Sequence, residues 1–268
     1  MEEVESGNVL AAKAAGAVGA GSVSDAVGET CAHVVGVASP PSAATAPLPV
    51  MRKPREEAFL VARGLELKTI RGYAYRGVDL DVGRGQVVAV RGRNGSGKTA
   101  LLLTLAGRMR FTKGSLAVGG LELSHNRARI ERRVGLGLVA GLNELQENLT
   151  AANAVSAEFG LFRRPSRREL VVAYLDEWDL AEVAEVRVKD LTAEKLAQLG
   201  IALAFAGGPD AVVIDDVEDQ LTMSQSEGLI DLLKRAARER NAAVVVGVIE
   251  RSLGERADAC IYLEKGGE

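Results

Sequence analysis

The chain has 268 residues, of which 47% are apolar, 26% charged and 4% aromatic, and it carries 33 Lys and Arg against 36 Asp and Glu. This length fits one large domain or two small ones with a substantial core, and the net charge of −3 excludes a strongly basic nucleic-acid-binding protein. Two cysteines, Cys31 and Cys260, cannot form a disulfide framework, and no His/Cys cluster has the spacing of metal ligands. A reducing, cytoplasmic compartment therefore fits best.

Residues 1–57 are predicted to form a low-complexity, disordered tail. The first 50 residues are rich in Ala, Val, Gly, Ser and Pro and contain no Phe, Trp or Tyr, a composition that cannot build a packed core. Three glutamates among the first five residues disfavour a secretory signal. The longest uncharged stretch, 30–51, contains four prolines, and later apolar runs have only strand length. We therefore expect no transmembrane helix.

From about residue 59, short apolar runs bounded by glycine alternate with helical patterns. Strands are predicted at 59–62, 77–82, 86–92, 115–120, 133–139, 210–215 and 242–249. Helices are predicted at 99–110, within 149–191, at 193–206 and at 224–239, with N-terminal capping boxes at Ser166/Glu169 and Ser224/Glu227. This alternation predicts an α/β fold with a mainly parallel sheet.

The segment GRNGSGKT, from Gly92 to Thr99, matches G-x-x-x-x-G-K-[S/T] between a predicted strand and a predicted helix. Its glycines let successive backbone N–H groups point at phosphate oxygens, and the following helix adds its positive end. Lys98 is placed to reach the β- and γ-phosphates, and the Thr99 hydroxyl to hold Mg²⁺. The predicted nucleotide-binding residues are Gly92, Arg93, Asn94, Gly95, Ser96, Gly97, Lys98, Thr99 and Ala100.

Asp215 follows the apolar run 210–214, at the carboxyl end of a predicted strand. Ligands of open α/β sheets bind at this end of the strands. An aspartate at a strand end is common by itself, but beside a phosphate loop it is predicted to hold Mg²⁺ through water, with Thr99 as the other metal-site residue.

The layout of residues 58–268 resembles the nucleotide-binding domain of ATP-binding cassette (ABC) transporters. The resemblance is carried by the segments 77–107, 113–120, 147–155, 189–221 and 257–267. It implies a P-loop NTPase fold of ABC type, which has a mainly parallel core sheet with flanking helices, a small antiparallel β part and a helical subdomain at about 148–191. Residues 58–268 would form this ATP-binding domain.

The resemblance is weaker at the residues that act on the γ-phosphate. Where the family has L-S-G-G-Q, this chain has L-T-A-E-K at residues 191–195. Thr192 still offers a hydroxyl, but Glu194 brings negative charge toward a phosphate unless Lys195 compensates. The family's catalytic glutamate is replaced by Asp216, one methylene shorter, which would hold the attacking water at the wrong distance. Asp216 and Lys98 are the implied catalytic residues.

Three further family positions also differ. The switch histidine is absent, because both histidines lie upstream, and Glu250 or its neighbour stands there. The Q-loop position aligns with Gly141, and Gln146 is the nearest glutamine. No aromatic residue stands at the adenine-stacking position near Ile70, where Tyr73 is the predicted substitute and Tyr75 the alternative. Nucleotide binding is therefore expected to be retained and hydrolysis to be weak.

The resemblance implies an ATP-binding subunit that binds ATP and Mg²⁺, forms a homo- or heterodimer and couples to a separate integral membrane permease. It would lie in the cytoplasm, peripheral on the inner face of the cell membrane. Two alternatives stay open: a hydrolysis-deficient regulatory partner in a heterodimer, and a soluble ATPase acting on nucleic acid. Residues 51–268 carry 32 basic and 31 acidic side chains, which disfavours nucleic acid, and the basic cluster at 163–168 is interpreted as a solvated loop.

Overall fold

A computed structural model of the chain describes residues 58–70 and 72–264. These residues belong to one compact unit, Leu48–Glu268. The predicted tail at 1–57 lies outside the described residues. None of the helices within the described ranges combines the length and the apolar character needed to cross a bilayer.

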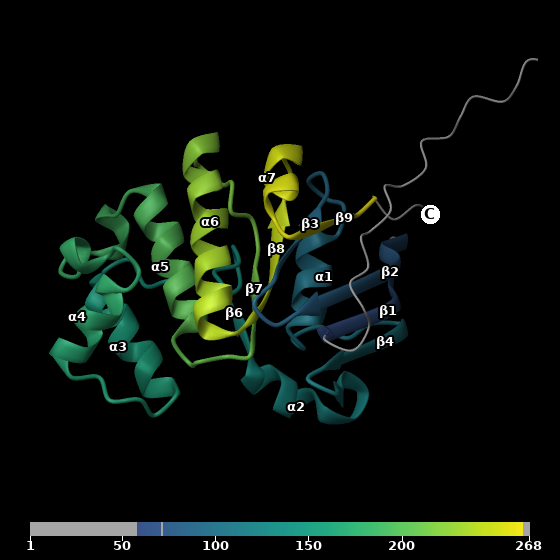
Figure 1. The fold of residues 1–268 in the computed structure, drawn as a ribbon, viewed down its shortest axis with the longest axis horizontal. Helices are drawn as coiled ribbons and strands as arrows, with labels where there is room; N and C mark the ends of the chain where they lie inside the picture. Colours follow the sequence, from purple (N-terminus) through teal and green to yellow (C-terminus); the bar gives the residue numbers. More distant parts are fainter. Residues whose placement is uncertain (1–57, 71, 265–268) are drawn as a thin grey trace, which may run out of the picture. The chain divides into compact units, whose positions relative to one another are not determined.

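Four strands form an antiparallel sheet in the order β2-β1-β4-β5 (Figure 1). Its strands are β1 (Ala58–Thr69), β2 (Gly72–Gly83), β4 (Lys113–Val118) and β5 (Leu121–Glu122). The first two strands extend well beyond the apolar runs that predicted them. Their pairing continues through polar positions such as Lys68 opposite Tyr73, because backbone hydrogen bonds hold a hairpin together without an apolar pattern.

Five strands form a parallel sheet in the order β6-β7-β8-β3-β9. They are β6 (Val134–Leu136), β7 (Ala211–Ile214), β8 (Ala243–Val248), β3 (Val87–Arg91) and β9 (Ala259–Tyr262). β7 and β8 are buried along their whole length, as expected of strands covered on both faces. The predicted α/β class, with a parallel sheet, flanking helices and a small antiparallel part, is confirmed.

Alternate residues of the parallel strands feed two separate cores. In β3, Val88 and Val90 belong to a core shared with the antiparallel sheet and with α1 (Lys98–Leu105). Val87 and Ala89 belong to the opposite core, shared with α5 (Ala193–Phe205) and α6 (Met223–Arg240). This division follows from the two-residue period of a strand. The parallel pairing of β3 and β7 with β8 brings the ends of both strands to the same edge of the sheet.

The remaining helices are α2 (Leu123–Arg133), α3 (Ala151–Leu161), α4 (Arg168–Asp176) and α7 (Arg251–Arg256), with short 3₁₀ turns at Ala181–Val183 and Val188–Asp190. Aromatic contacts join α3 and α4 to α5: the ring centroids of Phe159 and Tyr174 lie 5.1 Å apart, those of Tyr174 and Trp178 6.2 Å, and those of Trp178 and Phe205 5.3 Å. Trp178 therefore packs in the core.

Both predicted capping boxes are wrong. α4 begins after Arg167, which makes no side-chain cap, so Ser166 lies one position too early. α6 begins after Thr222, whose side chain caps the helix reciprocally with Gln225. Thr222 and Gln225 have the same three-residue spacing as the predicted pair two positions later, so spacing alone could not choose between them.

Candidate phosphate-binding site

The loop between β3 and α1 requires glycine at two positions. Gly97 has a φ of 92°, and a Cβ atom there would lie 2.0 Å from the carbonyl oxygen of Ala74. A Cβ atom on Gly92 would lie 2.4 Å from the Ser96 hydroxyl and 2.8 Å from the carbonyl oxygen of Leu263. The loop therefore winds tightly before α1, with no room for side chains at these two positions.

Lys98 folds back across this loop. Its Nζ donates to the carbonyl oxygens of Gly92 at 2.8 Å and of Arg93 at 3.3 Å, and the residue is buried. Nearby, the Ser96 hydroxyl is also buried and has no hydrogen-bond partner among residues 58–70 and 72–264. A buried ammonium and an unpartnered hydroxyl at a helix N-terminus suit a phosphate group, which offers both of them acceptor oxygens.

Arg93, Asn94 and Gly95 form the exposed outer part of the loop, and Ala100 is partly buried in α1. Arg91, which precedes the loop, is engaged elsewhere. Its guanidinium lies 5.3 Å from the ring centroid of Tyr262 and donates to the carbonyl oxygen of Ile249 at 3.3 Å. Arg93 is therefore the more accessible of the two arginines beside the loop.

Asp215 lies directly after β7, at the edge where the phosphate loop follows β3. Its Oδ2 atom accepts a hydrogen bond from the Thr99 hydroxyl at 2.5 Å. Gly247 in β8 leaves space for the Asp215 carboxylate, since a Cβ atom there would lie 2.8 Å from Oδ1. A hydroxyl and a carboxylate side by side are oxygen donors of the kind that Mg²⁺ binds with waters and substrate phosphates, so the predicted metal residues fit the ion.

Asp216 has a φ of 45°, in the left-handed region. Burial, with the charges of Asp215 and Asp219, raises the pKa of its carboxyl, while the backbone N–H of Glu218 and the charge of Lys98 act in the opposite direction. The end of β7 thus concentrates negative charge beside the phosphate loop, an arrangement that a divalent cation would neutralise.

Three side chains of the segment at 191–195 contact other groups of the protein. The Thr192 hydroxyl caps α5, accepting from the backbone N–H of Lys195 at 3.3 Å. Glu194 accepts from the Gln225 side chain at 3.0 Å. The Lys195 ammonium donates to the carbonyl oxygen of Asp179 at 2.7 Å and pairs with Glu182 at 3.0 Å. The compensation of Glu194 by Lys195 therefore does not form, because these partners draw the ammonium away.

Tyr73 and Tyr75, the two tyrosines considered for stacking on the adenine base, have different surroundings. Tyr75 is fully buried, and its hydroxyl lies 2.8 Å from the Thr104 hydroxyl in α1, which excludes it from a nucleotide site. The ring of Tyr73 lies near two cations, with the Lys68 Nζ 5.7 Å and the Arg76 Cζ 4.9 Å from its centroid. Tyr73 is followed by Ala74, whose backbone touches the phosphate loop, so it remains the candidate.

Sequence reasoning placed the Q-loop position at Gly141 but missed the side chains that hold the surrounding loop, 137–144. Asn143 accepts from the backbone N–H of Val139 at 2.7 Å and donates to the carbonyl oxygen of Gly137 at 3.0 Å, while Glu144 accepts from Gly141 at 2.8 Å. A second missed group, Glu218, accepts from backbone N–H groups at 249 and 250. Only the turn-forming residue types Gly and Asn gave a signal for the first loop.

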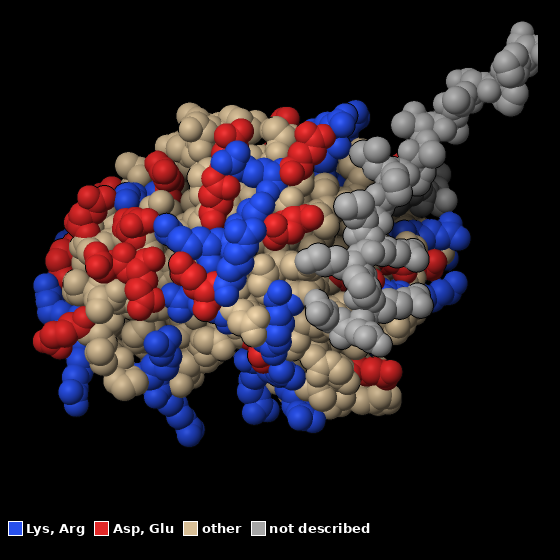
Figure 2. Space-filling model, viewed as in Figure 1, with Lys and Arg blue, Asp and Glu red and all other residues tan. Residues whose placement is uncertain are grey.

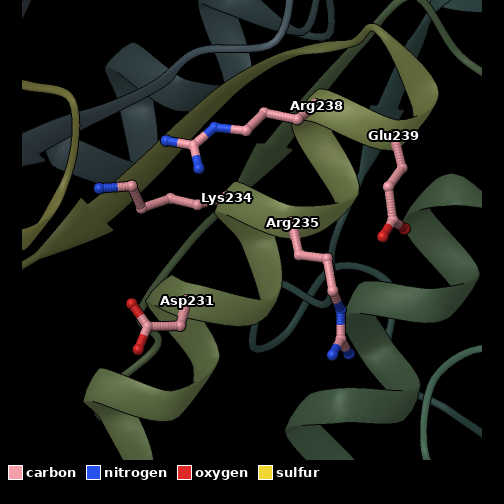
Figure 3. A pocket seen from close by; sticks show the side chains of 5 residues that line it. All are labelled: Asp231, Lys234, Arg235, Arg238 and Glu239. Carbon is pink, nitrogen blue, oxygen red and sulfur yellow. The ribbon is translucent and has the colours of Figure 1, made fainter.

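A surface hollow along α6 is lined by Asp231, Lys234, Arg235, Arg238 and Glu239. Lys234 and Arg238 extend to one side of the helix and Arg235 to the other (Figure 3). All three cations are paired. Lys234 and Arg238 lie 3.4 and 3.5 Å from the Asp258 carboxylate, and Arg235 lies 3.3 Å from that of Asp179. Figure 2 shows acidic and basic side chains interspersed over this face, as on an ordinary solvated surface.

Comparisons with known proteins point to one family. A sequence profile described as "ABC transporter" matches residues 75–218. A phosphonates import ATP-binding protein of Hyphomonas neptunium is 30% identical over 200 residues, which cover 70% of this chain and 76% of the relative. A lipoprotein-releasing system ATP-binding protein of Pseudomonas fluorescens is 28% identical over 196 residues, covering 71% and 86%.

Solved structures share the fold at lower identity. A dimeric ATP-binding cassette in a post-hydrolysis state, bound to ADP and Pi, has a TM-score of 0.67 and 22% identity and covers 77% of this chain and 95% of its own. CbiO1 of Clostridium perfringens, part of an ABC transporter complex, has a TM-score of 0.68 and 18% identity and covers 79% and 86%. At these identities the likenesses concern the fold alone.

Proposed function

We propose, from the premise that this chain belongs to the ABC transporter family, that it binds Mg·ATP and couples this binding to a separate membrane permease. In this proposal residues 58–268 are the ATP-binding domain, 148–191 its helical subdomain and 1–57 a tail. The proposed nucleotide-binding residues are those of the loop from Gly92 to Ala100 together with Tyr73.

The observation that carries the proposal is the joining of Lys98, Thr99 and Asp215 at one edge of the parallel sheet. Lys98 holds a buried ammonium in the loop, where it would contact phosphate oxygens. Thr99 and Asp215 lie in hydrogen-bonding contact, where they would hold Mg²⁺, and the ion would shield the charge of the β- and γ-phosphates. A nucleoside triphosphate with its metal satisfies all three groups.

Hydrolysis would depend on Asp216, the carboxylate beside the proposed metal residue. Burial, and after it the negative charges of Asp215 and Asp219, raise the pKa of its carboxyl, and bound Mg²⁺ would act in the opposite direction by favouring the ionised form. An ionised Asp216 would orient the attacking water. Because the side chain is one methylene shorter than glutamate, we expect turnover to be slow.

The partners are proposed from the relatives. Two relatives are named as ATP-binding proteins of an import system and of a lipoprotein-releasing system, and a neighbour in fold is a dimeric cassette. We accordingly propose a homo- or heterodimer of ATP-binding subunits on the cytoplasmic face of the membrane, held there by an integral membrane permease. A polytopic membrane protein encoded beside this chain and co-purifying with it would identify that permease.

A second candidate function is a regulatory ATP-binding partner without turnover of its own. It is favoured by the segment at 191–195, where Glu194 is a carboxylate, Lys195 is paired elsewhere and the Thr192 hydroxyl caps a helix. Both charged side chains of this segment are thus engaged by other residues of the chain. In this case a different subunit would complete the site over the phosphate loop.

Titration of a fluorescent ATP analogue, followed by steady-state ATPase measurement, tests both candidates. We expect binding by the full chain and its loss in Lys98→Ala, because the only ammonium in the loop is removed. Lys113→Ala, which removes an exposed lysine paired with Glu66 at 3.7 Å, serves as the control. Turnover that disappears in Asp216→Asn supports the ATPase, and binding without turnover supports the regulatory partner. Unchanged affinity in Lys98→Ala contradicts both.

A further inference from the structure

Glu218 holds the backbone just before a helix that lies far from it in the sequence. Its carboxylate accepts the backbone N–H of Ile249 in a short hydrogen bond and that of Glu250 at 2.9 Å. These N–H groups precede α7, whose N-cap residue Glu250 makes no side-chain cap. The Glu218 carboxylate therefore holds the two residues that directly precede the first turn of α7.

Glu218 is close in the chain to the proposed nucleotide site. Glu218 lies in the turn that directly follows β7, two residues beyond Asp216 and three beyond the proposed metal residue Asp215. The short segment from Asp215 to Glu218, together with the hydrogen bonds that the Glu218 carboxylate accepts, therefore connects the end of β7 to the N–H groups at 249 and 250. Hydrogen bonds to an ionised carboxylate are stronger than those between neutral groups.

Ile249 is held from a second direction by the residue before the phosphate loop. Its carbonyl oxygen accepts from the Arg91 Nε at 3.3 Å, and Arg91 is the last residue of β3. Ile249 is thus held by two side chains: Glu218 bonds its N–H and Arg91 bonds its carbonyl oxygen. A ligand that orders both the phosphate loop and the end of β7 would therefore act on the segments that carry Arg91 and Glu218.

We infer that Glu218 is a positioning residue that couples nucleotide binding at Lys98, Thr99 and Asp215 to the start of α7. This inference rests on the proposed function. A nucleotide with its metal restrains the end of β7, the restraint holds the Glu218 backbone, and the Glu218 carboxylate fixes the N–H groups at 249 and 250. Without that carboxylate, the site still binds nucleotide but α7 no longer responds.

Hydrogen–deuterium exchange of the peptide containing Ile249 and Glu250, in the full chain with and without Mg·AMP-PNP, tests the coupling. In the wild-type protein we expect the nucleotide to slow exchange at these two amides. Glu218→Ala should speed their exchange about 10-fold without nucleotide, as for the loss of one net hydrogen bond. It should also abolish the slowing by nucleotide, while affinity for the analogue stays within about 2-fold because the phosphate loop is untouched.

Two further variants distinguish the loss of the Glu218 hydrogen bonds from the loss of a negative charge and from a failure to fold. Glu218→Gln keeps one carbonyl acceptor, so it should retain part of the nucleotide-dependent slowing. Asp219→Ala removes an equal charge at the next position, where the carboxylate contacts Gln220, and should behave as wild type at 249–250. If Glu218→Ala fails to fold, the comparison of Glu218→Gln with Asp219→Ala decides the question.

The outcomes also separate this inference from the proposed function. Persistence of the slowing in Glu218→Ala, or its absence from a wild-type protein that binds the analogue, overturns the coupling and leaves nucleotide binding intact. Equal loss of the slowing in Asp219→Ala also overturns it, because charge alone would explain the effect. A wild-type protein with no affinity for ATP or its analogue overturns the proposed function and the coupling together.

Discussion

The Thr99 hydroxyl lies 2.5 Å from the Oδ2 atom of Asp215, which joins the first turn of α1 to the end of β7 across 116 positions of sequence. Neither residue could reach the other without the parallel pairing of β3 through β8 to β7. The sheet thereby builds an oxygen-donor pair beside the phosphate loop. Its predicted role in holding Mg²⁺ leads to the first test.

Asp215→Asn should raise the Mg²⁺ concentration needed to stabilise bound nucleotide by about 10-fold or more. An amide oxygen carries no net charge, so the attraction to a divalent cation is largely lost. Titration of Mg²⁺ into the protein with a fluorescent ATP analogue measures this concentration. Asp219→Asn removes a nearby exposed charge and should change it far less. Equal Mg²⁺ requirements in Asp215→Asn and the wild type would remove Asp215 from the metal site.

Gly247→Ala, in the neighbouring strand β8, should also raise the Mg²⁺ concentration needed to stabilise bound nucleotide. The added methyl would lie 2.8 Å from the Asp215 Oδ1 and 2.9 Å from the Leu102 Cδ1, so the carboxylate has to move. The control is Gly228→Ala in α6, where nothing lies within 4 Å of the added carbon and the helix should gain about 0.5–1 kcal/mol. The same Mg²⁺ titration and a thermal melt compare the two. An unaltered Mg²⁺ requirement in Gly247→Ala would show that Asp215 tolerates displacement.

Asp216→Asn should make the ligand-free protein more stable at pH 7. Burial, Asp215 and Asp219 raise the folded-state pKa of Asp216 above its ordinary value of 3.8, so the folded state binds this proton more tightly than the unfolded state. Stability therefore falls as the pH rises from about the unfolded pKa through the folded one, and the penalty persists at neutral pH. Asparagine carries no charge and avoids it. Thermal melts at pH 7 should show a higher Tm in Asp216→Asn, and the difference should shrink toward pH 4.

Asp231→Asn should change the stability at pH 7 in the opposite direction. A hydrogen bond from Arg256 lowers the pKa of Asp231, so the charged form stabilises the fold at neutral pH and this contribution is lost as the pH falls through the folded-state pKa. Its Tm at pH 7 should therefore be lower than that of the wild type. A lower Tm for Asp216→Asn as well would show that Asp216 is stabilised, not crowded, by its surroundings.

Much of this site could be predicted from the sequence. The phosphate loop carries a local signature, with glycines at the places where backbone approach leaves no room, and Asp215 follows an apolar run whose end must reach the same sheet edge. The partners of Lys195 and Glu218 could not be predicted, because they depend on where separate loops come together. α2 was missed for a related reason: it buries only Leu123 and Ile130, too few for a helical apolar pattern.

Tyr73→Ala should weaken ATP binding by about 3- to 10-fold, the loss expected when an aromatic face no longer stacks on a base. Tyr75→Phe is the matched control, since it removes the hydroxyl that contacts Thr104 in the core. It should cost about 1 kcal/mol of unfolding free energy and leave affinity unchanged. Affinity is read from the fluorescent analogue and stability from urea unfolding. Full affinity in Tyr73→Ala would place the base elsewhere.

The contact between Gly97 and the carbonyl oxygen of Ala74 has a consequence for how such a site can diversify. There the antiparallel sheet meets the phosphate loop backbone to backbone, so any side chain at position 97 is excluded, whereas the identity of the side chains along β2 does not enter the contact. Tyr73, one position away, can change without disturbing the loop. Position 97 must therefore remain glycine, whereas the neighbouring side chains of β2 can be substituted.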